Sequence, residues 1–169
     1  MFSCFSLTGA DLTTDRLVLR PWSGTETAAV LADLRPAHWA ADFPAEGDRV
    51  IAGFVAGTPH ARGEFGQRQI VERASGLVVG AVGLFWPPAD GCLEIGYGVV
   101  PSRRGRGYAT EAARALVEFA RTAPGVHTVC ARVDASNPAS GRVLEKAGLE
   151  CRGSDGEQAT FRTPAPPGR

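Results

Sequence analysis

The chain has 169 residues, 44% of them hydrophobic and 21% charged, a composition typical of one globular domain large enough to bury a core. Eighteen Lys and Arg residues balance eighteen Asp and Glu residues, so no overall charge attracts nucleic acid or an anionic membrane. The sequence has no run of about 18 apolar residues, and its first ten residues lack the basic start of a secretory signal. We therefore expect a cytoplasmic protein with no membrane span and no nucleic-acid partner.

Apolar residues that alternate, or that recur at helical spacing, predict the elements of the fold. In chain order these are a strand at 17–19, helices at 25–34 and 48–55, strands at 66–72, 77–85 and 92–100, a helix at 107–122, a strand at 126–133, a helix at 137–147, and strands at 149–152 and 159–162. The order β-α-α-β-β-β-α-β-α-β-β implies an α/β architecture, with a mixed sheet and helices on both faces. We expect one domain at 11–163, an N-terminal extension at 1–10 and a disordered tail at 164–169.

Turn and cap residues set the ends of several elements. Pro21 ends the first strand, and Ser23 or Thr25 can cap the helix after it. A proline pair at 87–88 and an Asp-Gly pair at 90–91 predict the turn before the strand at 92–100.

The cysteines and histidines form no cluster. None of the four cysteines belongs to a CxxC pair: Cys4, Cys92, Cys130 and Cys151. The three histidines do not complete the spacing of a zinc site. We therefore interpret the cysteines as reduced thiols within the fold and expect no metal.

Residues 99–110, VVPSRRGRGYAT, carry the most informative pattern in the chain. A strand ends there, a basic turn follows, and a long amphipathic helix begins. The first N–H groups of a helix have no intrahelical acceptor, and the helix dipole adds positive potential. Gly105 and Gly107 leave room for phosphate oxygens to approach the backbone. The turn also contains three arginines: Arg103, Arg104 and Arg106.

Several interpretations of this turn can be compared on the residues alone. A Walker loop needs a lysine, and none is present here. A Rossmann fingerprint needs a third glycine where this chain has Thr110. A pyrophosphate-binding turn and a purely structural turn both remain compatible with the spacing.

Five ordered motifs resemble one known family. The segment Arg104-x-x-Gly107-x-Ala109 matches the [QR]-x-x-G-x-[GA] pyrophosphate loop of the GNAT superfamily of N-acetyltransferases. Three further motifs resemble its RimJ/RimL-type branch: a Thr-x-Arg-Leu-x-Leu-Arg strand at 14–20, a Gly-Tyr-Ala-Thr-Glu-Ala helix start at 107–112, and Asn-x-x-Ser-x-x-x-Leu-Glu-Lys-x-Gly at 137–148. An Ile-Gly-Tyr strand at 95–97 also fits, and together the motifs cover most of residues 11–152.

The resemblance implies the GNAT acyl-CoA N-acyltransferase fold, with a mixed, mostly antiparallel sheet flanked by helices. It implies acetyl-CoA as cosubstrate and direct transfer of the acetyl group to a primary amine, on a protein N-terminus or a small molecule, in a ternary complex. In such proteins pantetheine pairs with a strand splayed from its neighbour, here the strand at 95–100, and Gly98 is expected to form the bulge that starts the splay. The resemblance leaves a homodimer open.

The resemblance also assigns roles to individual residues. The expected cofactor-binding residues are Val99, Val100, Arg104, Gly105, Arg106, Gly107, Tyr108, Ala109, Thr110 and Asn137. The expected catalytic residues are Glu94 as a general base acting through water, Ser140 as an acid on the thiolate, and Glu157 as a second candidate base. The expected acceptor-binding residues are His38, Trp39 and Trp86. For Glu94 a surface position, for Asn137 a plain helix cap, and for the aromatic residues core packing are the alternative interpretations.

Two departures from the family pattern keep other functions open. The chain after Gly153 is short and poor in apolar residues, where such proteins carry two strands that close the acceptor site. The tyrosine that acts as acid in many GNAT enzymes is also absent, since Tyr97 lies in a strand and Tyr108 in the phosphate loop. A catalytically weak or inactive CoA-binding module, or a structural partner protein, are therefore the alternative functions.

Overall fold

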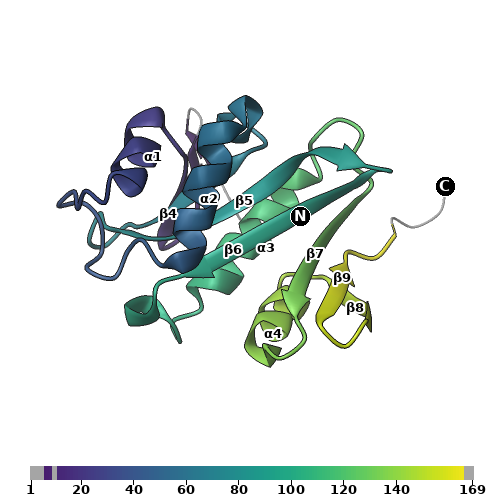
Figure 1. Cartoon of the computed structure of the whole chain (residues 1–169). Coiled ribbons are helices and arrows are strands. Elements are labelled where there is room, and N and C mark those ends of the chain that lie inside the picture. The colour runs from purple at the N-terminus through teal and green to yellow at the C-terminus, as the bar shows by residue number, and fades with distance from the viewer. Residues whose placement is uncertain (1–5, 9–10, 166–169) are drawn as a thin grey trace.

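The computed structural model describes residues 6–8 and 11–165, which form one central sheet flanked by helices (Figure 1). The strands of this described part are β1 (Ser6–Thr8), β2 (Asp11–Thr13), β3 (Leu17–Pro21), β4 (Gln67–Glu72), β5 (Val78–Ala89), β6 (Cys92–Val99), β7 (Thr128–Asp134), β8 (Glu150–Ser154) and β9 (Gln158–Arg162). The helices are α1 (Gly24–Leu31), α2 (Glu46–Gly57), α3 (Tyr108–Ala120) and α4 (Pro138–Lys146), with short 3-10 turns η1 (Pro59–Arg62) and η2 (Pro101–Arg103). Cys4 and residues 166–169 of the tail predicted at 164–169 lie outside the described residues.

The strand order explains where the sheet opens. The strands lie in the order β1-β2-β3-β4-β5-β6-β7-β9-β8, and every neighbouring pair is antiparallel except β6 and β7. That parallel pair is joined at only three positions, from Cys92↔Thr128 to Glu94↔Cys130. Beyond Glu94 the two strands no longer pair, so the second half of β6 has an open backbone edge. The expected mixed, mostly antiparallel sheet is confirmed.

Helices lie on both faces of the sheet. Figure 1 shows α1 and α2 in front of the sheet and α3 behind it. Phe54 of α2 packs on Phe85 of β5, with ring centroids 5.6 Å apart. On the opposite face Phe119 of α3 stacks on Phe65 at 5.3 Å. In the described ranges no helix combines the length and apolar character needed to cross a bilayer.

The packing of α3 fixes the position of its first turn. Ala112, Leu116 and Phe119 recur at helical spacing and are at most 2% exposed. Full burial of a Leu or Phe side chain stabilises a fold by about 1.5–3 kcal/mol. Because this buried stripe anchors α3 on the sheet, the start of the helix at Tyr108 is held beside the end of β6.

Two expectations about the strands were wrong in detail. Residues 6–8 of the expected extension form β1 and pair with β2, and the extension itself stays a prediction. The prolines at 87–88 lie inside β5, where pairing with β6 is interrupted between Phe85 and Ala89, so no ladder hydrogen bond is needed from them. The turn consists of Asp90 and Gly91, with φ of 51° and 75°. Gly98 forms no bulge, because its register with β5 is regular.

Candidate active site

The turn between β6 and α3, residues 100–107, presents a row of backbone donors, and we call it the donor turn. Gly105 and Gly107 have φ of 77° and 80°, in the left-handed region that favours glycine. Among the described residues, none accepts a hydrogen bond from the N–H groups of residues 105–110, and Gly107 supplies no side-chain cap to α3. Successive N–H groups in such turns, together with the helix dipole, favour a bound anion.

Glu72, at the end of β4, binds side chains of this turn and of the first helical residue through its carboxylate. Its Oε2 accepts hydrogen bonds from Tyr108 Oη at 2.8 Å and Arg103 Nε at 3.1 Å, and Arg106 Nη1 lies 3.7 Å away. Ser75 Oγ donates to the other carboxylate oxygen at 2.7 Å. Burial acts to raise the pKa of Glu72, but the hydrogen bonds from Ser75 and Tyr108 and the charge of Arg103 lower it below its ordinary value. The turn is therefore fixed to a carboxylate that stays ionised at neutral pH.

A second carboxylate, Glu111 of α3, joins the helix start to the first long strand. It accepts hydrogen bonds from Thr14 Oγ1 at 2.8 Å, from the Arg16 backbone N–H at 2.9 Å and from Arg16 Nε at 2.7 Å. Arg16 Nη1 donates in turn to the Arg106 carbonyl at 2.7 Å, and its guanidinium lies 4.8 Å above the Tyr108 ring. The sequence motifs at 14–20 and 107–112 therefore meet in one network around the donor turn.

Arg104 and Val100, which follow the end of β6, already use polar groups in hydrogen bonds within the protein. Arg104 Nε donates to the Val99 carbonyl at 3.0 Å, so the guanidinium folds back along β6. Val100 donates its N–H to Val79 and accepts from Arg103, and its side chain is fully buried. The backbone of Val100 is therefore already paired within the protein, and its role in cofactor binding stays a prediction.

A hollow of about 660 Å³ adjoins the first turn of α3 and includes Thr110. Its basic residues are Arg16, Arg114 and Lys146, and its acidic residues are Asp15 and Glu111. Basic side chains beside uncapped helix N–H groups extend the region in which a phosphate group is stabilised.

The separation of β6 from β7 creates a hollow of about 220 Å³ between them. Tyr97 lies in it, and its hydroxyl contacts Ser140 Oγ at 2.7 Å and donates to the Ser140 carbonyl at 2.9 Å. Burial raises the pKa of Tyr97, while the hydrogen bond with Ser140 acts to lower it. Asn137 caps α4 by accepting from the Ser140 N–H at 3.2 Å and also lines this hollow. A phenol and a hydroxyl therefore lie side by side in the gap.

The opposite face of β6 forms a second cavity, the α2 cleft. This cleft of about 410 Å³ lies between the start of α2 and strands β5 and β6 and reaches Arg104. A Cβ at Gly96 would lie 3.1 Å from the Phe85 ring, whereas a Cβ at Gly98 would meet no atom within 4 Å. Asp48, the third residue of α2, is 5% exposed and lines the cleft. No role for Asp48 is predicted from the sequence, because an acid in the first turn of a helix resembles an ordinary cap.

The two predicted carboxylate bases lie outside the α2 cleft. Glu94 faces β7, and Arg132 holds both its oxygens at 3.2 Å, at the point where the strands separate. Glu157 is exposed in the turn between β8 and β9, and its carbonyl accepts from the Ala135 N–H at 2.8 Å. Their catalytic roles stay predictions, and the structure brings neither next to Asp48.

The aromatic residues expected to bind the acceptor pack within the protein. Trp39 is 6% exposed, stacks edge-on against Phe43 at 5.2 Å and donates from Nε1 to Glu26 at 2.6 Å. His38 is half-exposed, and its Nε2 pairs with the same Glu26. Trp86 stacks on Phe65, which in turn stacks on α3 on the face away from the α2 cleft. None of the three aromatic residues lines the α2 cleft, and their roles in acceptor binding stay predictions.

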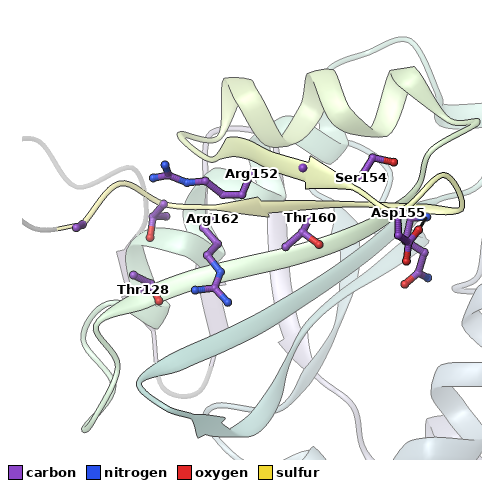
Figure 2. A pocket seen from close by; sticks show the side chains of 10 residues that line it. Thr128, Arg152, Ser154, Asp155, Thr160 and Arg162 are labelled. Carbon is purple, nitrogen blue, oxygen red and sulfur yellow. Dashed lines mark hydrogen bonds between the residues drawn. The ribbon is translucent and has the colours of Figure 1, made fainter.

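A further hollow of about 620 Å³ lies against the C-terminal hairpin (Figure 2). Figure 2 shows Thr160 and Arg162 of β9 pointing into it, together with Thr128 at the start of β7. None of its lining residues belongs to α2, β6 or the donor turn, so it is separate from the cavities above. β8 and β9 pair along their length, with one register shift between Cys151 and Gly153.

Comparisons with known proteins agree with this geometry. A protein of Bacillus subtilis (strain 168), the uncharacterized N-acetyltransferase YjdG, is 35% identical over 81 residues; the match covers 47% of this chain and about half, 48%, of that relative. An acetyltransferase of the GNAT family from Bacillus anthracis has a similar structure, with a TM-score of 0.65, 21% identity, and coverage of 90% of this chain and 96% of that one. RimL, a ribosomal L7/L12 alpha-N-protein acetyltransferase solved with coenzyme A, has a TM-score of 0.63 at 17% identity, covering 88% and 94%.

At these identities the two solved structures show a common fold. The model of one family, the acetyltransferase (GNAT) domain, matches residues 16–150, a span that runs from β3 through the donor turn and α4. The chain therefore belongs to the GNAT acetyltransferase family.

Proposed function

We propose that this protein is an acetyl-CoA-dependent N-acetyltransferase that passes the acetyl group directly to a primary amine in a ternary complex. The observation that carries the proposal is the row of N–H groups at 105–110, which no described residue occupies, beside a strand edge that is also open. A diphosphate bound there would gain several charge-assisted hydrogen bonds of roughly 1.5–3 kcal/mol each. Membership of the acetyltransferase family supports acetyl-CoA as the source of that diphosphate.

The open edge of β6 would hold the pantetheine arm. Backbone groups alternate along a strand, and the Val100 N–H points to β5, where it donates to Val79. The N–H groups of Ile95, Tyr97 and Val99 therefore face the gap towards β7. Pantetheine amides can pair with this edge as an additional strand would. We assign the Val99 N–H to the oxyanion that forms during acetyl transfer.

Tyr97 and Ser140 take the place of the tyrosine acid that the family pattern led us to expect elsewhere. Both hydroxyls line the gap where the thiol would leave. The raised pKa of Tyr97 keeps its proton in place at neutral pH. Because a thiol has a pKa near 8.5, the departing thiolate needs only modest help, which this pair can supply.

The acceptor is proposed to be a protein N-terminus or a small-molecule amine, as in the RimJ/RimL-type branch. Two branch motifs support the placement, since Thr14 and Arg16 of one bind Glu111 of the other. The name of RimL, an alpha-N-protein acetyltransferase, agrees with this acceptor class. We retain the expectations of a cytoplasmic location and of a single domain at 11–163.

Binding of acetyl-CoA to Thr110 variants tests the proposal. Replacing a turn glycine would strain the backbone, because Gly105 and Gly107 have positive φ. Thr110 lies in the first helical turn, where a glutamate favours the helix but repels a diphosphate. We expect Thr110→Glu to weaken acetyl-CoA binding by roughly tenfold or more in a calorimetric titration, and Thr110→Gln, equal in length, to lose much less. Equal affinities in the two variants would refute the anion site.

Measurement of thiol release separates turnover from binding alone. An enzyme releases free coenzyme A when acetyl-CoA is mixed with a panel of primary amines. A CoA-binding module binds acetyl-CoA without this release, and a structural partner protein gives no binding heat. The paired β8–β9 hairpin and the Tyr97–Ser140 pair favour the enzyme, since they supply two paired final strands and an acidic hydroxyl, the two features in which the sequence departs from the family pattern.

A further inference from the structure

Asp48 is a buried carboxylate with one oxygen left over. Its Oδ2 accepts the Ala45 N–H at 2.8 Å at the start of α2. No described residue donates a hydrogen bond to its other oxygen, although the side chain is 5% exposed and lines the α2 cleft. This second oxygen is not among the fully enclosed atoms that lack a partner, so it is reachable from the cleft. Helix capping accounts for one oxygen only.

The cleft also lacks a cation of its own for this carboxylate. Arg104, its one basic lining residue, donates to the Val99 carbonyl instead. Arg49, next to Asp48 on α2, pairs with Asp33 at 2.7 Å. The remaining ionisable group in the lining is Tyr97, whose hydroxyl reaches Ser140 on the other side of β6. Burial raises the pKa of Asp48 to about 6, against a smaller lowering by the Ala45 N–H.

We propose that Asp48 binds the ammonium group of the acceptor in the α2 cleft and removes its proton, and that the acceptor is a singly charged amine with a compact apolar body. This proposal rests on the proposed acetyl transfer. The cleft holds one carboxylate, so it offers one site for a positive charge. The rest of its wall is largely apolar, with Ile51 of α2 and Ala81 and Val82 of β5. A polyamine would leave its further charges against that wall.

Acetyl transfer to the bound ammonium releases two protons from nitrogen and one thiolate. The Asp48 carboxylate takes one proton from the ammonium, which leaves a neutral amine with a lone pair. The amine nitrogen attacks the thioester carbonyl carbon, the new C–N bond forms and the C–S bond breaks. The amide nitrogen loses its second proton to water, and the departing thiolate takes one proton from the Tyr97–Ser140 pair, which solvent then reprotonates. Asp48 returns its own proton to water, so the net change is the release of one proton to solvent. The products are the acetylated amine and free coenzyme A.

The α2 cleft lies beside the part of β6 where the thioester is proposed to bind. Gly96 and Gly98 line the α2 cleft, while Tyr97 between them points into the gap on the other face. An amine in the cleft can therefore reach a thioester held along β6 past two residues that have no side chain. Glu94, the base suggested by the family pattern, is paired with Arg132 outside this cleft.

The test compares Asp48→Asn with Glu46→Gln in the full-length protein. Glu46 also lies in the first turn of α2, is exposed and does not line the cleft, so its variant controls for the loss of one negative charge. We expect Asp48→Asn to bind acetyl-CoA within about twofold of wild type and to lose at least about 100-fold in kcat/KM for a peptide α-amine. The wild-type acidic limb of the pH–rate profile should disappear in Asp48→Asn and persist in Glu46→Gln. Asp48→Glu, which keeps the charge, should recover part of the rate and restore an acidic limb.

Acceptor preference provides a second measurement. Wild type should favour a peptide with a small apolar first residue over spermidine by tenfold or more in kcat/KM. Three results would each overturn the assignment while leaving acetyl transfer intact. These are full activity of Asp48→Asn, loss of the acidic limb of the pH–rate profile in Glu94→Gln instead of Asp48→Asn, and a preference for spermidine. If wild type neither binds acetyl-CoA nor releases thiol, the proposed function fails as well, and the two failures are thereby distinguished.

Discussion

Replacement of Asp48 by Asn should stabilise the fold at alkaline pH. The pKa of this carboxyl is 3.8 in water-exposed chains and about 6 in the folded protein, where burial is the main cause. A raised pKa means that the folded state binds the proton more tightly, so its contribution to stability is present below pH 4 and is lost as pH rises through 6. At 1.36 kcal/mol per pKa unit, the charged side chain costs the fold about 3 kcal/mol at pH 8 and about 1.5 kcal/mol at pH 5.

Asn keeps the shape of Asp48 and can still accept the Ala45 N–H, but it carries no charge. The gain in unfolding free energy of Asp48→Asn over wild type should therefore be larger at pH 8 than at pH 5 by about 1.5 kcal/mol. Urea denaturation followed by tryptophan fluorescence measures both values, and taking their difference cancels any change in packing. Glu46→Gln should show no such difference, because Glu46 is exposed. A gain that is the same at both pH values, or a loss that grows with pH, would refute the account of Asp48 as a buried charge.

Two further predictions concern the donor turn and the gap. Glu72→Gln should lower acetyl-CoA affinity by about tenfold and the unfolding free energy by about 1–3 kcal/mol at pH 7, because Arg103 loses its charged partner. Since the pKa of Glu72 is lowered, its stabilisation is present above pH 4.5 and is lost as pH falls, so the deficit measured by urea denaturation should shrink at pH 4. Tyr97→Phe should bind acetyl-CoA normally and reduce the rate of thiol release by about tenfold or less; a loss above 100-fold would contradict the modest role given to the acid.

The sequence was sufficient for the elements and for the donor turn. Periodic apolar residues located the strands and helices within a few positions, because burial on one face is what these patterns record. The glycines at 105 and 107 were interpretable because positive φ and close approach to the backbone are requirements that few other residues meet. These features depend on residues close together in the sequence, and such short-range patterns can be recognised in a single sequence.

The acceptor site could not be predicted because it depends on which face of the sheet each residue occupies. Trp39 and Trp86 have the size of ligand-binding aromatic residues, but Trp39 is buried against Phe43 and Trp86 is partly buried against Phe65. Tyr97 alternates with two glycines along β6, and only the placement of α4 shows that it points to Ser140. From its position in α2 alone Asp48 resembles a cap, and only the packing of α2 beside β5 and β6 places it in a cleft. Each of these roles is set by contacts between distant segments.

A methyl group at Gly98 offers a direct test of where the acceptor lies. A Cβ built there meets no protein atom within 4 Å, and the residue lines the α2 cleft, so Gly98→Ala should fold at least as well as wild type. The added methyl would occupy the path between the acceptor amine and the thioester. We expect kcat/KM for the amine to fall by tenfold or more while acetyl-CoA affinity changes little, as measured by steady-state kinetics and calorimetry.

Gly53→Ala is the matched control for this change. Gly53 is an exposed residue within α2 whose Cβ would also meet no atom, so alanine there should raise the unfolding free energy by about 0.5–1 kcal/mol without altering kinetics. A Gly98→Ala protein that acetylates as fast as the Gly53→Ala protein would show that the amine does not approach across this face of β6. In that case the acceptor would have to reach the thioester from outside the α2 cleft.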